Sequence, residues 1–410
     1  MYRLLIPIGL LLLIDLYFFQ LVRTVGSDLS VRWRVTLNVG FWLLSVLTVL
    51  LVILRAIKVS WPNHVRYYIF SLLLVMLVPK LIGVLFLLGE DLFRLTKGLL
   101  GMFQSEDDGF LSERRKFVSQ LGLIAAAIPF STMVYGMVRT AFNIQVKKKT
   151  VVFDDLPPAF DGLTIAQISD LHAGSFSSSG FFGSAIDRIL ELKPDLVFFT
   201  GDLVNNAAAE AEPHLNEFRR LKAKLGVYSV LGNHDYGDYG PWPSHEAKRA
   251  NLARLKEIQQ EAGWKLLLNN HHILESGGEK LAIVGVENWG ASQHFPKYGD
   301  LDKATSGIED IPFKILLSHD PSHWDAKIKD HPQKFQLTLS GHTHGAQFGI
   351  EIPGFKWSPV QYMYKQWAGL YEFEGQNLYV NRGLGFIGYM GRIGIAPEIT
   401  LLELKSSKNA

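Results

Sequence analysis

Four long apolar segments constrain the first third of the chain. They cover residues 4–22, 35–54, 67–89 and 117–138. About 20 apolar residues are enough for a helix to cross a hydrocarbon core of about 30 Å, and in hydrocarbon the backbone must satisfy its own hydrogen bonds. We therefore predict a transmembrane region of four helices over residues 1–140. The alternative is a signal peptide followed by core helices, but a small soluble domain could hardly bury three such segments.

Two ionisable side chains lie inside these segments, Asp15 in the first and Lys80 in the third. The first and third helices of such a region run in the same direction, and both residues fall slightly past the middle of the span. An ion pair between them would offset the cost of a charge in hydrocarbon. Lipid-facing side chains and a transport role are the alternatives, although a transport path needs more polar groups.

The orientation of the membrane region rests on one basic cluster. Basic residues are equally numerous in the two sets of alternate loops, so their overall count does not decide the topology. Arg114-Arg115-Lys116 directly precedes the fourth segment, as in a twin-arginine export signal or in a plain stop-transfer flank. Either reading favours the cytoplasm for the cluster. We predict an integral, multi-pass membrane protein in which the residues after Val138 are extracytoplasmic.

The remainder of the chain has the pattern of a globular α/β domain. Residues 141–160 are predicted to be a linker with an edge strand, and 161–410 a single domain. Strands at 163–169, 196–200 and 227–231 alternate with helices at 180–192, 207–225 and 247–262, and further strands follow near 280–286, 314–318, 335–340, 376–381 and 398–404. This order predicts two sheets packed face to face and flanked by helices.

Five of these strands end in residues of the types that bind metal ions. In chain order the ends supply Asp170 and His172, Asp202, Asn233 with His234 and Asp235, His319, and His342 with His344. The chain has no cysteine, so nitrogen and oxygen atoms must hold any metal. Such donors suit two divalent ions about 3.5–4 Å apart, bridged by a carboxylate. A His-x-His pair alone is weak evidence, whereas five strand ends in this order are specific.

On these motifs the chain resembles the calcineurin-like metallophosphoesterases, in their membrane-anchored branch, over about residues 160–405. The resemblance implies a four-layer α/β/β/α sandwich with a dinuclear site. It implies that one ion is held by Asp170, His172, Asp202 and His344, and the other by Asp202, Asn233, His319 and His342. His234 would be the catalytic imidazole, oriented by Asp235. The chain has Asn205 where the family more often has aspartate, but that position is not a ligand in the family.

The resemblance also implies a metal-dependent phosphoesterase in which a metal-bridging hydroxide attacks phosphorus. The ions and a protonated His234 would neutralise charge on the phosphoryl and leaving oxygens. No nucleophilic side chain is required. Several imidazole ligands favour manganese, iron or zinc over magnesium.

The substrate is predicted from apolar segments that follow strand ends near the site. Residues 348–371 are rich in aromatic side chains, and 383–390 form a glycine-rich apolar loop. In a membrane-anchored enzyme they favour a lipid-linked phosphoester, unless they simply pack on the sheet. The alternatives are a cytoplasm-facing UDP-2,3-diacylglucosamine-type pyrophosphatase and a non-catalytic membrane sensor or scaffold, which would have no use for His234. A net charge of +2 gives no reason to expect nucleic acid binding.

The remaining polar candidates lack motif spacing. His271 and His272 are expected in a solvated turn, and the surface is expected to hold His245, His294, His323 and His331. Arg382 and Arg392 could each meet a phosphate or pair with a carboxylate.

Overall fold

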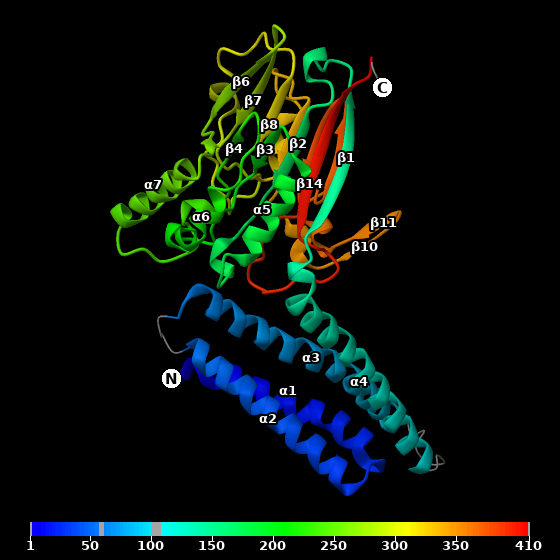
Figure 1. Cartoon of the computed structure of the whole chain (residues 1–410). Coiled ribbons are helices and arrows are strands. Elements are labelled where there is room, and N and C mark those ends of the chain that lie inside the picture. The colour runs from blue at the N-terminus through cyan, green and yellow to red at the C-terminus, as the bar shows by residue number, and fades with distance from the viewer. Residues whose placement is uncertain (1, 57–60, 100–107, 409–410) are drawn as a thin grey trace. The chain divides into compact units, whose positions relative to one another are not determined.

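The computed structural model describes residues 2–56, 61–99 and 108–408 (Figure 1). The chain divides into two compact units. The helical unit comprises Met1–Met137 with Gly388–Gly391. The second unit comprises Val138–Ile387 with Arg392–Ala410 and carries the predicted metal-binding motifs, so it is called the catalytic unit after the activity that they predict.

The first sheet of the catalytic unit has the strand order β1-β14-β2-β3-β4-β5. Its strands are β1 (Gln145–Phe153), β14 (Glu398–Ser406), β2 (Thr164–Ile168), β3 (Leu196–Phe199), β4 (Val227–Ser229) and β5 (Lys265–Leu266). Strands β2 to β5 are parallel, and β14 runs antiparallel to β2 but parallel to β1. The carboxyl ends of β2, β3 and β4 therefore meet at one edge.

The second sheet has the strand order β12-β13-β9-β8-β7-β6. Its strands are β12 (Gly369–Phe373), β13 (Gln376–Val380), β9 (Leu337–Ser340), β8 (Lys314–Leu317), β7 (Glu279–Gly285) and β6 (Asn270–Ser276). The four inner strands are parallel, and an antiparallel strand lies at each edge. Two further strands, β10 (Ile350–Ile352) and β11 (Phe355–Trp357), pair only with each other.

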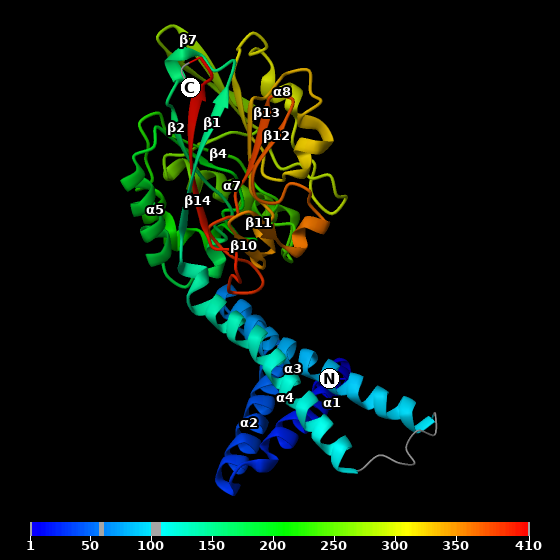
Figure 2. The ribbon, with the colours of Figure 1, turned by 90° about the vertical axis from the view of Figure 1, so that its right-hand side faces the viewer.

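The main core lies between the two sheets. It combines Phe198 and Tyr228 of the first sheet with Ile283 and Ile315 of the second. Helices cover the outer faces, as Figure 2 shows for α5 (Gly180–Leu192) beside the first sheet and α8 (Leu301–Thr305) beside the second. Leu301 packs with side chains of the second sheet in a separate cluster. The predicted α/β fold of two sheets flanked by helices is confirmed.

Two local predictions were wrong. The expected helix at 207–225 is only short pieces, Ala208–Glu210, Glu212–His214 and α6 (Leu215–Phe218), because Pro213 lacks an N–H and cannot continue a helix. The expected turn at His271 and His272 is part of β6, where the His271 ring bonds to the Ala304 carbonyl at 2.8 Å. The helix α7 (His245–Glu261) lies within two residues of its predicted bounds.

The helical unit confirms the four predicted spans. Its helices are α1 (Tyr2–Val25), α2 (Val31–Ala56), α3 (Asn63–Leu99) and α4 (Asp108–Val138), and each is long and apolar enough to cross a membrane. They exceed the apolar segments in length because they continue into polar sequence. With 37 residues, α3 is about 55 Å long.

The basic cluster before the fourth span is ion-paired in the structure. Its members pair with acidic or amide groups of other elements: Arg114 with Glu90, Arg115 with Asp91 and Gln20, and Lys116 with Asp28. Glu90 and Asp91 lie in the part of α3 beyond the predicted span. The cluster thus holds α4 to α1 and α3 as well as carrying charge.

The intramembrane residues Asp15 and Lys80 form the predicted ion pair. Lys80 Nζ donates to Asp15 Oδ1 at 2.5 Å, and both side chains are almost completely buried. Lys80 Nζ also lies 5.4 Å from the centre of the Phe41 ring. The pair joins α1 to α3 and removes the cost of an isolated charge in hydrocarbon.

We expect Asp15→Leu and Lys80→Leu each to destabilise the helical unit by about 3–5 kcal/mol, because each leaves a buried charge unpaired. The folded yield in detergent measures the loss. The double variant should recover much of that yield, since no charge is then left over. Additive losses in the double variant would show that the two side chains do not depend on each other.

Candidate metal centre

The predicted ligands come from strand ends of both sheets. Asp170 and His172 follow β2, and Asp202 follows β3, while the remaining members follow β4, β8 and β9: Asn233, His319, His342 and His344. The side-chain amide of Gln167 donates to the Ser340 carbonyl at 2.9 Å, which joins β2 to β9 across the sandwich. This contact brings the loop edges of the two sheets together.

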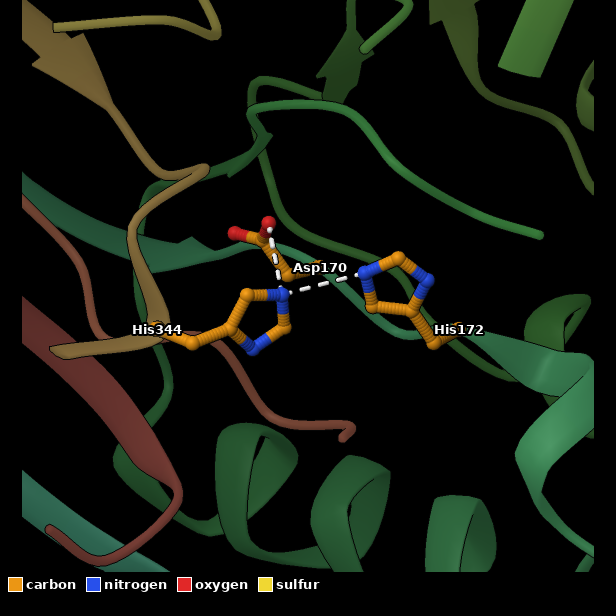
Figure 3. A group of neighbouring side chains, drawn as sticks. All are labelled: Asp170, His172 and His344. Carbon is orange, nitrogen blue, oxygen red and sulfur yellow. Dashed lines mark hydrogen bonds and ion pairs between the residues drawn. The ribbon is translucent and has the colours of Figure 1, made fainter. Parts of the chain in front are cut away.

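The first cluster consists of Asp170, His172 and His344 (Figure 3). His344 Nε2 lies 3.3 Å from Asp170 Oδ1 and 3.0 Å from His172 Nε2. Figure 3 shows one nitrogen of the His344 ring facing both the Asp170 carboxylate and the His172 ring. One donor atom from each residue lies within 4.8 Å of the others, and all three residues are buried. The group can hold one metal ion.

The second cluster consists of Asp202, His319 and His342. The amide oxygen Asn233 Oδ1 lies 3.1 Å from His319 Nε2 and 2.8 Å from His342 Nδ1, so Asn233 belongs to the same group. Asp202 links the clusters, because its Oδ2 lies 3.2 Å from His319 Nε2 and 3.7 Å from His172 Nε2. Two groups of nitrogen and oxygen donors sharing one carboxylate fit a dinuclear centre of borderline divalent ions.

Five of the seven predicted ligands have left-handed backbone conformations. The φ angles are 51° at Asp170, 46° at His172, 60° at Asp202, 71° at His342 and 50° at His344. Only a few per cent of non-glycine residues adopt positive φ, and a strained backbone costs on the order of 1–3 kcal/mol per residue. Such strain persists only where the surroundings impose it, and it concentrates at functional sites.

The glycines of the motifs are required by close approach. A Cβ at Gly232 would lie 2.2 Å from Asp202 Oδ1, and one at Gly341 would lie 2.3 Å from Asp170 Oδ2. Each carboxylate therefore occupies space that any side chain at the glycine would fill. The close packing around the two clusters therefore requires glycine at the strand ends of these two motifs.

Burial and neighbouring charges shift the pKa values of the two carboxylates in opposite directions. Burial alone would raise the pKa of Asp170 and Asp202, but His344 beside the first and His319 beside the second hold each pKa well below its usual range. Burial lowers the pKa of His172 and His342. Burial opposes a proton on His319 too, yet Asp202 overrides it and raises that pKa to about 10. The site therefore attracts positive charge, and metal ions compete with protons for it.

The expected relation between His234 and Asp235 was wrong. The His234 ring is oriented by a backbone group, because Nδ1–H donates to the Asn205 carbonyl at 2.8 Å. Asp235 instead accepts backbone N–H groups from Asp202, Leu203, Val204 and Gly232 at 2.8–3.2 Å. Asp235 thus fixes the loops that carry Asp202 and His234, and it does not bind the His234 ring.

Residues outside the predicted set orient the ligands. Asn205 Oδ1 accepts from His172 Nδ1 at 2.9 Å, so the position that departs from the family pattern supports a ligand without being one. The Thr200 carbonyl accepts from His319 Nδ1 at 2.7 Å. Such partners fix the ring orientation and tautomer of metal-binding histidines. Only Asn205 could have been noticed in the sequence.

Two tyrosines contact the second cluster. Tyr364 lies in the aromatic segment expected near the site, whereas Tyr239 was not predicted. Tyr364 OH lies 2.8 Å from His342 Nε2, and Asn233 Nδ2 donates to Tyr239 OH at 2.9 Å. The Tyr239 ring also lies 4.5 Å from the His234 ring, between centroids. The two tyrosines therefore form part of the wall around the second cluster.

The other polar candidates have structural partners. Arg382 pairs with Glu398 and Glu351, whereas Arg392 is fully buried and donates to backbone carbonyls, with Nη2 at 3.3 Å from His344 Nδ1. His323 is not a surface group, since it is buried and stacked on Trp289. The loop at 383–390 is not a free apolar loop, because it buries Leu384 and Phe386.

The fold and the paired clusters define a metallohydrolase of the two-metal class. Comparison with known families agrees. Residues 2–141 match the transmembrane domain of a probable calcineurin-like phosphoesterase, described as 4TM_phosphoesterase, and residues 163–346 match the calcineurin-like phosphoesterase family. The chain belongs to the calcineurin-like phosphoesterases with an N-terminal transmembrane domain, and it is a metal-dependent phosphoesterase.

Individual relatives cover most of the chain. The uncharacterized metallophosphoesterase YkuE of Bacillus subtilis is 30% identical over 72% of this chain and 99% of the relative. A UDP-2,3-diacylglucosamine pyrophosphatase, LpxG, of Chlamydia trachomatis is 30% identical over 61% of this chain and 86% of the relative. A transmembrane protein with metallophosphoesterase domain of Danio rerio is 29% identical over 70% of this chain, which spans 62% of that protein.

We expect Asn205→Leu to weaken metal binding about 10–100-fold, because His172 loses the acceptor that orients its ring. Chelator competition on the purified full chain measures the affinity. Asn205→Asp is the matched control, because aspartate also accepts from His172 Nδ1, and it should retain the affinity. Equal affinities for the leucine variant and the unmodified chain would contradict the role of this contact.

Proposed function

We propose that this phosphoesterase acts on a lipid-linked phosphoester and that its catalytic unit faces away from the cytoplasm. One segment supports the lipid assignment. Tyr364 contacts the second cluster through His342, while the neighbouring Tyr362 and Met363 are 79% and 81% exposed. An apolar surface thus adjoins the metal site in a protein with four candidate membrane spans, which suits a substrate with acyl or prenyl chains.

We further propose three functional regions. The transmembrane region is 1–140, the linker with its edge strand is 141–160, and the phosphoesterase domain is 161–410. The strand β1 at the edge of the first sheet supports a linker that is anchored to the domain it precedes.

The donor geometry supports the ligand assignment implied by the family motifs. Asp170, His172 and His344 would hold one ion, and Asn233, His319 and His342 the other, with Asp202 shared. When bound, the two ions supply Lewis acidity that lowers the pKa of water and neutralises phosphoryl charge. The burial of His172 and His342 favours their neutral, ligating forms. The mixed nitrogen and oxygen donors suit manganese, iron or zinc.

The role proposed for His234 is proton donation to the leaving oxygen. Its Nδ1–H is fixed on the Asn205 carbonyl, so Nε2 is the nitrogen that can carry a transferable proton. The backbone N–H of His234 donates to Asp202 Oδ1 at 2.8 Å, which fixes the imidazole close to the shared carboxylate. A general acid held in this way contributes about 10²–10⁴ in rate.

A second candidate follows from the relatives. The similarity to a UDP-2,3-diacylglucosamine pyrophosphatase favours a nucleotide-linked lipid. This candidate is the cytoplasm-facing alternative of the sequence analysis. Both candidates place a lipid phosphoester at the same metal centre. They differ in the membrane face on which the catalytic unit lies, so topology separates them.

We expect His234→Ala to reduce turnover of an aryl phosphodiester or monoester by about 10²–10⁴ while both metal ions stay bound. Steady-state kinetics in Mn²⁺ and metal analysis of the purified chain measure the two effects. The control is His245→Ala, which removes an exposed imidazole from the start of α7 and should leave turnover unchanged. Loss of metal from the His234 variant would reassign His234 as a ligand, and full activity in excess chelator would rule out a metal mechanism.

We expect a reporter that is active only outside the cytoplasm to be active when fused after Lys149 and silent when fused after Leu99, one span earlier. Neutralising Arg114, Arg115 and Lys116 together should reduce or scramble this orientation, because they directly precede the fourth span. Neutralising Lys147, Lys148 and Lys149 is the matched control and should leave it unchanged, since these lysines lie farther from the span. A reporter that is silent after Lys149 and active after Leu99 would place the catalytic unit in the cytoplasm. The nucleotide-lipid pyrophosphatase would then be the leading candidate.

A further inference from the structure

The hairpin formed by β10 and β11 has two chemically distinct faces. Its register pairs Ile350 with Trp357, Glu351 with Lys356, and Ile352 with Phe355. Side chains alternate across a strand, so the Glu351 pair points to one face and the two apolar pairs point to the other. The hairpin joins neither six-stranded sheet.

The polar face of this hairpin is attached to the catalytic unit. Arg382 Nη2 donates to Glu351 Oε1 at 2.9 Å, and Lys147 Nζ lies 3.4 Å from the same oxygen. Lys356 Nζ donates to the Ala368 carbonyl at 2.6 Å and lies 5.4 Å from the centre of the Trp367 ring. These contacts fix the hairpin in one orientation.

The apolar face is directed outward. Ile350 is 50% exposed, Ile352 58% and Phe355 52%, and Phe348, two residues before Ile350, is 44% exposed. A small antiparallel sheet normally packs its apolar face on the protein and turns its polar face to water. This hairpin does the reverse, and contiguous exposed apolar side chains mark an interaction surface.

One contact of the hairpin lies close in the chain to the last membrane-spanning helix. Lys147, which pairs with Glu351, lies nine residues after Val138, the last residue of α4, so an extended linker spans at most about 30 Å. A lipid surface is therefore the partner that the covalent structure keeps within reach.

We propose that Phe348, Ile350, Ile352 and Phe355 insert into the interfacial layer of the bilayer and fasten the catalytic unit to the membrane surface. Interfacial segments bind by burying apolar side chains at the boundary of headgroups and acyl chains. The residues from Ser358 to Tyr364 directly follow β11, and Tyr364 contacts His342. Insertion would hold this side of the metal site next to lipid. The proposal concerns attachment and does not depend on which phosphoester is hydrolysed.

The chain has no cysteine, which allows one fluorescent probe to be placed on the hairpin. The full chain with Ile352→Cys is labelled with an environment-sensitive dye and reconstituted in phosphatidylcholine–phosphatidylglycerol nanodiscs. Quenching is measured with nitroxide-labelled lipid and, separately, with iodide in the buffer. The control is Glu275→Cys on β6, a strand residue of the same unit whose side chain is 63% exposed.

We expect nitroxide lipid to quench the Ile352 probe several-fold more than the Glu275 probe, and iodide to show the opposite order. Equal iodide quenching at both positions would place the hairpin in water and overturn the proposal. Protection of the Ile352 probe from both quenchers would overturn it as well, because a protein surface would then cover the hairpin. Phosphoesterase activity is measured on the same samples, so a wrong substrate assignment is distinguished from a hairpin that does not insert.

Discussion

The metal centre is built around the buried carboxylate of Asp202. This side chain lies between His172 and His319, and its own loop is held by backbone N–H bonds to Asp235. Gly232 has no side chain because Asp202 occupies that space. An uncompensated buried charge costs several kcal/mol, so this carboxylate must be surrounded by donors or cations. The positions of the neighbouring loops follow from that requirement.

The two units compensate buried carboxylates in different ways. In the helical unit the chain supplies the positive charge itself, through Lys80 beside Asp15. In the catalytic unit burial favours neutral forms of His172 and His342, so the imidazoles beside Asp170 and Asp202 cannot all carry charge. In the helical unit the charge of Asp15 is neutralised by the chain itself, so the pair stabilises the structure without a ligand. The arrangement in the catalytic unit leaves room for external cations, which is the property that a metalloenzyme needs.

Much of the fold could be predicted because it depends on simple patterns. The length of the apolar segments identifies the four helices, and the position of Asp15 and Lys80 within parallel spans predicts their contact. Strand-end motifs place the ligands because parallel strands bring their carboxyl ends to one edge. The break at Pro213 could also have been predicted, since proline interrupts helices.

Other features depend on three-dimensional context that no local pattern carries. The bonds of Asp235 and the contacts of Tyr239 and Tyr364 follow from loop geometry, and that geometry uses left-handed residues that sequence propensities disfavour. His323 was expected at the surface because a lone histidine carries no burial pattern, yet it is stacked on Trp289. The reversed hairpin has an ordinary alternating sequence, and only its ion pairs show which face is attached.

The left-handed conformation of five ligand residues has a consequence for the stability of the protein. Their strain opposes folding, whereas ions that bind only the folded chain stabilise it by mass action, by about 2.7 kcal/mol at a concentration 100-fold above the dissociation constant. The folded fraction therefore depends on the free metal concentration around the domain. A chain whose metal ions are removed therefore loses stability as well as turnover.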